Sequence, residues 1–158
     1  MSPAELTLRF FDRLKYETEI VEKTINVPKR GGGRMVFKRD AFGFADGMAY
    51  KPGDPITYAL QWTVGARFAD HVQKCLMANR ERKWTCLAAI PPAADTPEEP
   101  TRLAGRRLLV FAWRMVGPAG ARKLWQAEVA EIAGNDAIGW ASTVHKGTDD
   151  ELAKALGL

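Results

Sequence analysis

Two neighbouring stretches decide the fold of this chain: Phe44-Ala45-Asp46-Gly47-Met48-Ala49-Tyr50 and Ile56-Thr57-Tyr58-Ala59-Leu60-Gln61-Trp62-Thr63. Larger side chains alternate with small ones in the first stretch, and bulky apolar side chains alternate with small or polar ones in the second. The turn-rich segment Lys51-Pro52-Gly53-Asp54-Pro55 joins the two stretches. Period-two alternation bounded by Pro and Gly is typical of β-strands with a tight connection. The two stretches therefore predict a β-hairpin.

One face of this hairpin is predicted to be polar. Side chains alternate between the two faces of a strand, so the four bulky residues of the second stretch share one face. These are Ile56, Tyr58, Leu60 and Trp62. The opposite face carries Gln61 and Thr63, and the neighbouring strand contributes Asp46. Asp is a poor strand former, and the small residues Ala45 and Gly47 around it leave room for a ligand. We therefore expect a small polar functional site here.

The length and composition fit one globular domain. The chain has 158 residues, of which 46% are hydrophobic and 27% charged, so it can bury a core without support from metal or disulfides. A net charge of +4 makes nucleic acid a permitted partner but does not require it.

The cysteines and histidines argue against a zinc site, and the absence of a signal-like apolar segment argues against secretion. Cys75 and Cys86 form no Cys-x-x-Cys pair, and the sequence has only two histidines, His71 and His145. Neither an N-terminal signal segment nor an apolar run of about 18 residues is present. We expect a cytoplasmic protein that is not a membrane protein.

The remaining pattern predicts an α/β order of elements. Ser2, followed by Pro3 and Glu5, is typical of a helix start. Strands are predicted over 18–25, 35–37, 44–50, 56–63, 85–90, 107–114 and 123–132, with an amphipathic helix over 66–78. We place the main domain at 1–133. A tail over 134–158 then carries a short helix, which a capping box opens at Thr148.

This order, with acids on the central hairpin, resembles the PD-(D/E)XK nuclease superfamily, and within it the small phage-encoded, resolvase-like members. The resemblance is carried by Gly43-Phe44-Ala45-Asp46, by Gln61-Trp62-Thr63 and by the C-terminal hairpin that contains Val110-Phe111-Ala112-Trp113-Arg114. It implies a restriction-endonuclease-like fold: a mixed central sheet flanked by helices, with an extra C-terminal β-hairpin and a short terminal helix.

The resemblance also implies a metal site for Mg²⁺ or Mn²⁺. Asp46 matches the metal-binding aspartate of the superfamily, and Asp40 and the side-chain oxygen of Gln61 complete the expected ligands. Gln61 and Thr63 stand where the superfamily has Glu and Lys. The amide can still bind a cation through its oxygen, but Thr63 cannot supply the positive charge of a lysine.

Cations on the following helix offer a replacement for that charge. Arg67, His71 and Lys74 are spaced to share one helical face, with Lys74 as the surrogate lysine and His71 as a proton carrier. Alternatively, all three are solvated surface residues.

Basic residues before the hairpin are candidates for contacts to DNA phosphates. The expected contacts are Arg30, Arg34, Lys38, Arg39 and Arg67. The alternative is an ordinary solvated loop.

Three functions follow from this interpretation. The first is a divalent-metal-dependent DNA endonuclease; branched or recombination DNA and a homodimeric state are compatible with it. The second is a nuclease-fold protein without cleavage activity, which binds nucleic acid or takes part in phage assembly. Loss of both Glu and Lys from the hairpin motif keeps the second open. The third is a phage structural or host-interaction protein with no nucleic-acid role. A phage-encoded protein would act in the cytoplasm of the bacterial host cell.

Overall fold

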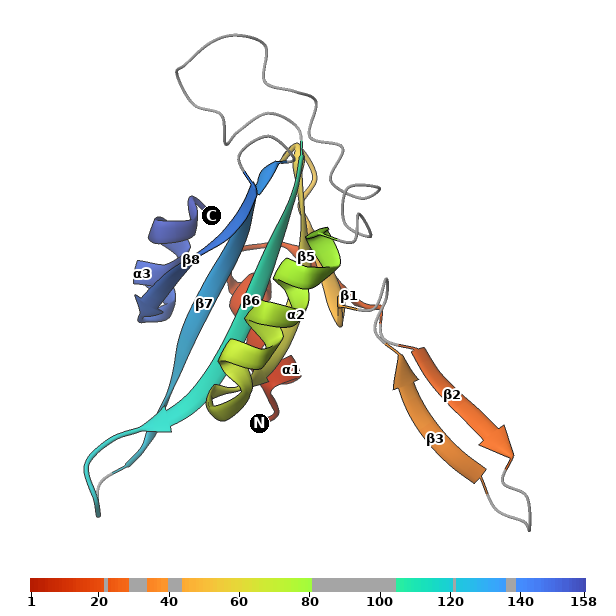
Figure 1. The fold of residues 1–158 in the computed structure, drawn as a ribbon. Helices are drawn as coiled ribbons and strands as arrows, with labels where there is room; N and C mark the ends of the chain where they lie inside the picture. The colour runs from red at the N-terminus through yellow and green to blue at the C-terminus, as the bar shows by residue number, and fades with distance from the viewer. Residues whose placement is uncertain (22, 29–33, 40–43, 81–104, 121, 136–138) are drawn as a thin grey trace, which may run out of the picture.

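A six-stranded mixed sheet forms the centre of the fold, and helices lie on both of its faces (Figure 1). The computed structural model describes residues 1–21, 23–28, 34–39, 44–80, 105–120, 122–135 and 139–158. Its elements are α1 (Pro3–Arg13), β1 (Glu17–Ile20), β2 (Lys23–Pro28), β3 (Arg34–Arg39), β4 (Gly47–Tyr50), β5 (Ile56–Val64), the 3₁₀ turn η1 (Gly65–Arg67), α2 (Phe68–Arg80), β6 (Gly105–Val116), β7 (Leu124–Asn135), β8 (Gly139–Gly147) and α3 (Asp149–Leu156).

The strands of the sheet follow the order β1-β4-β5-β6-β7-β8. Neighbours run antiparallel except β5 and β6, which are parallel and lie on either side of α2 in the sequence. A parallel pair needs a crossover connection, and such connections usually contain a helix. The α/β class and the mixed sheet expected from the sequence are thus confirmed. Strands β2 and β3 form a separate two-stranded sheet.

The predicted hairpin is β4 paired with β5 in antiparallel register. Its turn is closed by the Asp54 N–H, which donates to the Lys51 carbonyl oxygen at 3.0 Å. Gly53 has φ +85°, a backbone conformation that residues with a Cβ rarely adopt. The Asp54 side chain also accepts a hydrogen bond from the Ile56 N–H at 2.9 Å, so the turn sequence itself starts β5.

Both predicted capping boxes are present. The Glu5 N–H donates to Ser2 Oγ at 3.2 Å, and the Ser2 N–H donates to Glu5 Oε2 at 2.6 Å. The same reciprocal pair joins Thr148 and Glu151 at the start of α3. These bonds satisfy helix N–H groups that otherwise lack partners, so α1 and α3 begin where the sequence predicted.

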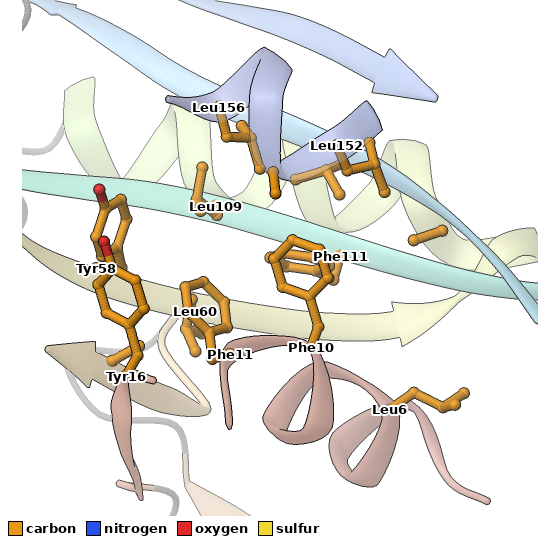
Figure 2. Close-up of a cluster of buried hydrophobic side chains, with 14 of the residues drawn as sticks. Leu6, Phe10, Phe11, Tyr16, Tyr58, Leu60, Leu109, Phe111, Leu152 and Leu156 are labelled. Carbon is orange, nitrogen blue, oxygen red and sulfur yellow. The ribbon is translucent and has the colours of Figure 1, made fainter. Parts of the chain in front are cut away.

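Two apolar clusters divide the core between the faces of the sheet. The larger one lies under α1 and α3 (Figure 2). Its main members are Leu6, Phe10, Phe11, Tyr58, Leu60, Leu109, Phe111, Leu152 and Leu156. The smaller cluster lies under α2, whose Cys75 is fully buried against Ala59, Leu108 and Val110. No described helix is long and apolar enough to cross a membrane.

The structure differs from the sequence expectations in two places. The single strand expected over 18–25 is divided between β1, which pairs with β4, and β2, which pairs with β3. Strand β8 was not expected, yet it pairs with β7 along nine residue pairs and extends the central sheet. The domain boundary expected at 133/134 stays a prediction; this position lies within β7, and α3 contributes to the larger cluster. The strand predicted over 85–90 lies outside the described residues.

Candidate functional site

Asp46 lies at the entry to β4, and its backbone is held from both sides. Its N–H donates to the Leu60 carbonyl oxygen at 2.8 Å, and its carbonyl oxygen accepts from the Val21 N–H at 2.9 Å. The next residue, Gly47, has no room for a side chain, because a Cβ there would lie 2.6 Å from the Trp62 ring. This close approach fixes β4 against β5 beside the Asp46 carboxylate.

The carboxylate of Asp46 is buried, with only 6% of the residue exposed. Its Oδ2 accepts a hydrogen bond from the Trp62 N–H at 3.0 Å and another from the Gln61 side-chain Nε2. A buried carboxylate is costly unless hydrogen bonds compensate it. Asp46 and Gln61 therefore form one buried polar pair, as the sequence predicted for the face that they share.

Within the described parts of the chain, the side-chain oxygen of Gln61 lacks a hydrogen-bond donor. The residue is 2% exposed, and its Oε1 accepts no hydrogen bond from any described residue. Leaving a buried acceptor unsatisfied costs about 1–3 kcal/mol. A ligand that brings a donor or a cation to this oxygen would recover that cost. Carbonyl and carboxylate oxygens are the ligands that Mg²⁺ prefers, so the chemistry of the pair fits such an ion.

Thr63 follows on the same face of β5 and is also buried. It is in register with Ala112 of β6, which pairs with Glu128 of β7, and Glu128 pairs with Lys146 of β8. Cross-strand partners point to the same side of a sheet. A polar row thus continues from Thr63 across small Ala112 to a second buried acid.

Glu128 is the site residue that the sequence analysis missed. It is only 8% exposed and binds Arg114 Nη2 through Oε2 and Lys146 Nζ through Oε1, the latter at 2.9 Å. The Arg114 side chain is about half exposed and lies beside Gly65, where a Cβ would be 3.3 Å from Arg114 Cβ. The sequence carries one indication of this site: Glu128 is a charged residue within the otherwise apolar strand segment Ala127-Glu128-Val129-Ala130.

Helix α2 covers this face of the sheet. Its Cys75 side packs on the smaller cluster together with Phe68, Val72 and Leu76, while His71 is half-buried. Lys74 is exposed, as expected for a residue about 100° around the helix from Cys75. Arg67, in η1, is exposed as well.

The structure thus brings Asp46 and Gln61 into contact and places Thr63 on the same face of the sheet. Of the other predicted site residues, Asp40 and Arg30 lie outside the described residues. Arg34, Lys38 and Arg39 belong to β3, away from the central sheet. In the described parts of the chain, no three His, Cys, Asp or Glu side chains gather as a metal-binding group. Asp46 is thus the only carboxylate that the structure places beside Gln61 within those parts.

A pocket of about 530 Å³ lies on the opposite face, between the sheet and α3. Three of its charged lining residues, Asp54, Arg107 and Glu131, have internal partners. Arg107 forms a bidentate ion pair with Glu131, with N–O distances of 2.7 and 2.8 Å. It also donates a hydrogen bond to the Leu156 carbonyl oxygen at 2.6 Å. Asp54 accepts from the Tyr16 hydroxyl at 2.6 Å. The Arg107 bond to Leu156 attaches α3 to the sheet, so we assign the pocket a structural role.

Comparison of the chain with family models, with curated proteins and with solved structures finds no match.

Proposed function

We propose that this protein is a divalent-metal-dependent DNA endonuclease with a restriction-endonuclease-like fold. The observation that carries the proposal is the buried Asp46–Gln61 pair, in which the Gln61 oxygen accepts no hydrogen bond from the described residues. Cleavage of a phosphodiester needs an activated water and positive charge near the phosphate. Hard oxygen ligands in a buried, preformed position are suited to hold the ion that provides both.

The order of elements supports the same proposal. Along the chain, α1, β1, β4, β5, α2 and β6 follow one another, with β2 and β3 set apart as a separate hairpin. This is the helix, strand, strand, strand, helix, strand order of the superfamily that the sequence resembles. Asp46 lies at the entry to the second of these sheet strands, and Gln61 and Thr63 lie in the third.

In this mechanism the Asp46 carboxylate and the Gln61 oxygen hold Mg²⁺ or Mn²⁺, with Asp40 as the further expected ligand. Such an ion would supply Lewis acidity to activate a water and positive charge beside the phosphate. The Thr63 hydroxyl can orient water or a phosphate oxygen through a hydrogen bond. The chain must supply further positive charge by other means, and Lys74, with His71 as proton carrier, or Arg114 can do so.

Arg114 is the more preorganised of the two cations. It lies two residues beyond Ala112 on the same face of β6, and the buried Glu128 binds its guanidinium. A preorganised charge stabilises a transition state better than one that must first become ordered. Lys74 lies on the exposed side of α2, which suits a contact to a neighbouring phosphate.

Incubation of the purified protein with supercoiled, single-stranded and four-way-junction DNA tests the proposal. We expect cleavage of at least one of these substrates with Mg²⁺ or Mn²⁺ and none with EDTA. Asp46→Asn should abolish the cleavage while DNA binding persists, because only the metal ligand changes. Absence of cleavage on all three substrates with both metals would contradict the proposal.

The second candidate is a nuclease-fold protein that binds DNA without cutting it. One observation favours it: the Gln61 amide donates a hydrogen bond to Asp46. This bond compensates part of the cost of burying the Asp46 carboxylate without a metal. DNA binding that is the same with Mg²⁺ and with EDTA, together with no cleavage, would support this candidate over the first.

A further inference from the structure

The hairpin of β2 and β3 stands apart from the rest of the fold. Figure 1 shows it projecting from the region of β1, away from the central sheet. Among the described elements, neither strand has substantial contact with any element except the other. An isolated two-stranded hairpin is at best marginally stable in water, so a partner is expected to cover it.

The pairing register gives the hairpin two different faces. Cross-strand partners share a face and successive pairs alternate. One face holds the pairs Lys23–Arg39, Ile25–Phe37 and Val27–Met35. The other holds Thr24–Lys38, Asn26–Val36 and Pro28–Arg34. By register, one face combines two apolar pairs with a basic pair at the base of the hairpin. The other carries Lys38 and Arg34 together with polar and apolar residues.

The charge of the hairpin identifies the class of partner. Its twelve strand residues, 23–28 and 34–39, include four basic residues and no Asp or Glu. Lys23 and Arg39 even lie directly opposite each other, an arrangement that destabilises a hairpin unless negative charge compensates it. A second copy of this chain would add the same positive charges, whereas a polyanion would neutralise them.

We propose that the β2–β3 hairpin is an arm that binds duplex DNA by lying along one of its grooves. The major groove is about 12 Å wide and admits a two-stranded ribbon. Six residues per strand span about 20 Å, which corresponds to about six base pairs. The basic residues contact phosphates, and the two apolar pairs contact base and sugar edges. This inference rests on DNA as the partner in the proposed function, but not on cleavage.

The test is duplex binding measured by fluorescence anisotropy in EDTA. The arm variant is Arg34→Ala with Lys38→Ala, and the control is Arg9→Ala with Lys154→Ala, two exposed basic residues of α1 and α3. We expect the arm variant to bind a 30-base-pair duplex at least about tenfold more weakly at 100 mM salt. The slope of log affinity against log salt should fall by about 1.8, the value for two lost phosphate contacts. The control should change affinity by less than about twofold.

Two further measurements make the test decisive. Since the arm is set apart from the central sheet, the arm variant should keep the melting temperature of the wild type, which separates lost binding from lost folding. A single strand of the same length should lose less affinity than the duplex, because it has no groove. Equal losses on both, or no difference between the arm and control variants, would overturn the proposal. So would a dimer that light scattering shows to dissociate on Phe37→Ser while duplex affinity is unchanged.

The outcome is independent of the cleavage assay. Duplex binding that depends on the arm, in a protein that cuts no DNA, would leave this inference in place and contradict the nuclease proposal. Metal-dependent cleavage by a protein whose duplex binding does not need the arm would support the nuclease proposal and contradict this inference.

Discussion

At the scale of single residues, Gln61 carries the most specific chemical information. Its Nε2 donates to the Asp46 carboxylate, and its buried Oε1 has no donor within the described part of the chain. An amide at this position can therefore keep Asp46 compensated in the absence of a metal and still offer an oxygen when one binds. A glutamate would offer more charge to the metal but would repel Asp46 without it.

Gln61→Glu tests this interpretation through stability. In EDTA the variant loses the hydrogen bond to Asp46 and places two buried carboxylates together, so we expect it to be about 1–3 kcal/mol less stable than the wild type. Saturating Mn²⁺ should restore most of that loss, because ligands that bind only the folded state stabilise it. Thermal melts with and without metal measure both effects. Gln61→Leu, which has no side-chain oxygen, should show no recovery; equal recovery in both variants would contradict the assignment.

Tyr16 gives a prediction about pH. Burial, and then the hydrogen bond that its hydroxyl donates to Asp54, raise the pKa of Tyr16 well above its ordinary value of 10.0. The unfolded chain therefore releases this proton at lower pH than the folded one. The corresponding stability is complete below about pH 10 and is lost as the pH rises above it.

Tyr16→Phe should accordingly flatten the alkaline limb of the stability profile. Chemical denaturation between pH 7 and pH 11 would show a smaller decline above about pH 10 than in the wild type. A constant offset of about 1 kcal/mol from the lost hydrogen bond is expected at all pH values. An unchanged decline would show that Tyr16 does not govern the alkaline limb.

At the scale of elements, the position of α2 determines which charges can reach the site. Its Cys75 face is buried, which leaves Lys74 exposed, while β6 and β7 hold Arg114 and Glu128 on the covered face of the sheet. In the proposed function, the helix would offer Lys74 and the sheet would offer Arg114, each for a different task.

We expect Arg114→Ala and Lys74→Ala to affect different kinetic steps. Removing a preorganised charge at a reacting centre costs about 10²–10³ in kcat, which we expect for Arg114→Ala. Lys74→Ala should mainly weaken DNA binding and lower the salt slope by about one unit. Single-turnover cleavage and equilibrium binding separate the two. A loss of kcat in Lys74→Ala together with weaker binding in Arg114→Ala would instead favour Lys74 as the surrogate lysine.

Local signals explain which elements could be predicted from the sequence. The capping boxes at Ser2 and Thr148 and the turn before Ile56 depend on neighbours in the chain, and each is present. Strand β8 and the division of 18–25 into β1 and β2 depend on pairing with distant strands. Glu128 was missed for the same reason, because the polar row that includes it exists only through the register of β5, β6 and β7.

At the scale of the whole molecule, the larger apolar cluster and the proposed site lie on opposite faces of one sheet. The face under α1 and α3 holds the larger cluster and the Arg107–Glu131 pair (Figure 2). The face under α2 holds Asp46, Gln61 and Thr63, with Leu108 and Val110 in the smaller cluster. Changes to one face should therefore affect one property more than the other.

Leu152→Ala tests this separation. Leu152 is fully buried between α3 and the sheet, so its truncation should lower the free energy of unfolding by about 2–5 kcal/mol. The Mn²⁺ affinity of the folded protein at low temperature should stay within about twofold of the wild type. Thermal melts and Mn²⁺ titration on the same sample check both statements, and a parallel loss of affinity would show that the faces are coupled.

The most direct test of the account is a Mn²⁺ titration followed by electron paramagnetic resonance, because the central claim is that the Asp46–Gln61 pair holds a divalent cation. We expect the wild type to bind Mn²⁺, and Asp46→Asn to bind it at least about tenfold more weakly, since the ligand loses its charge. The control Asp12→Asn removes an exposed acid of α1 and should match the wild type. Equal Mn²⁺ affinity in Asp46→Asn and the wild type, or no binding by either, would contradict the claim.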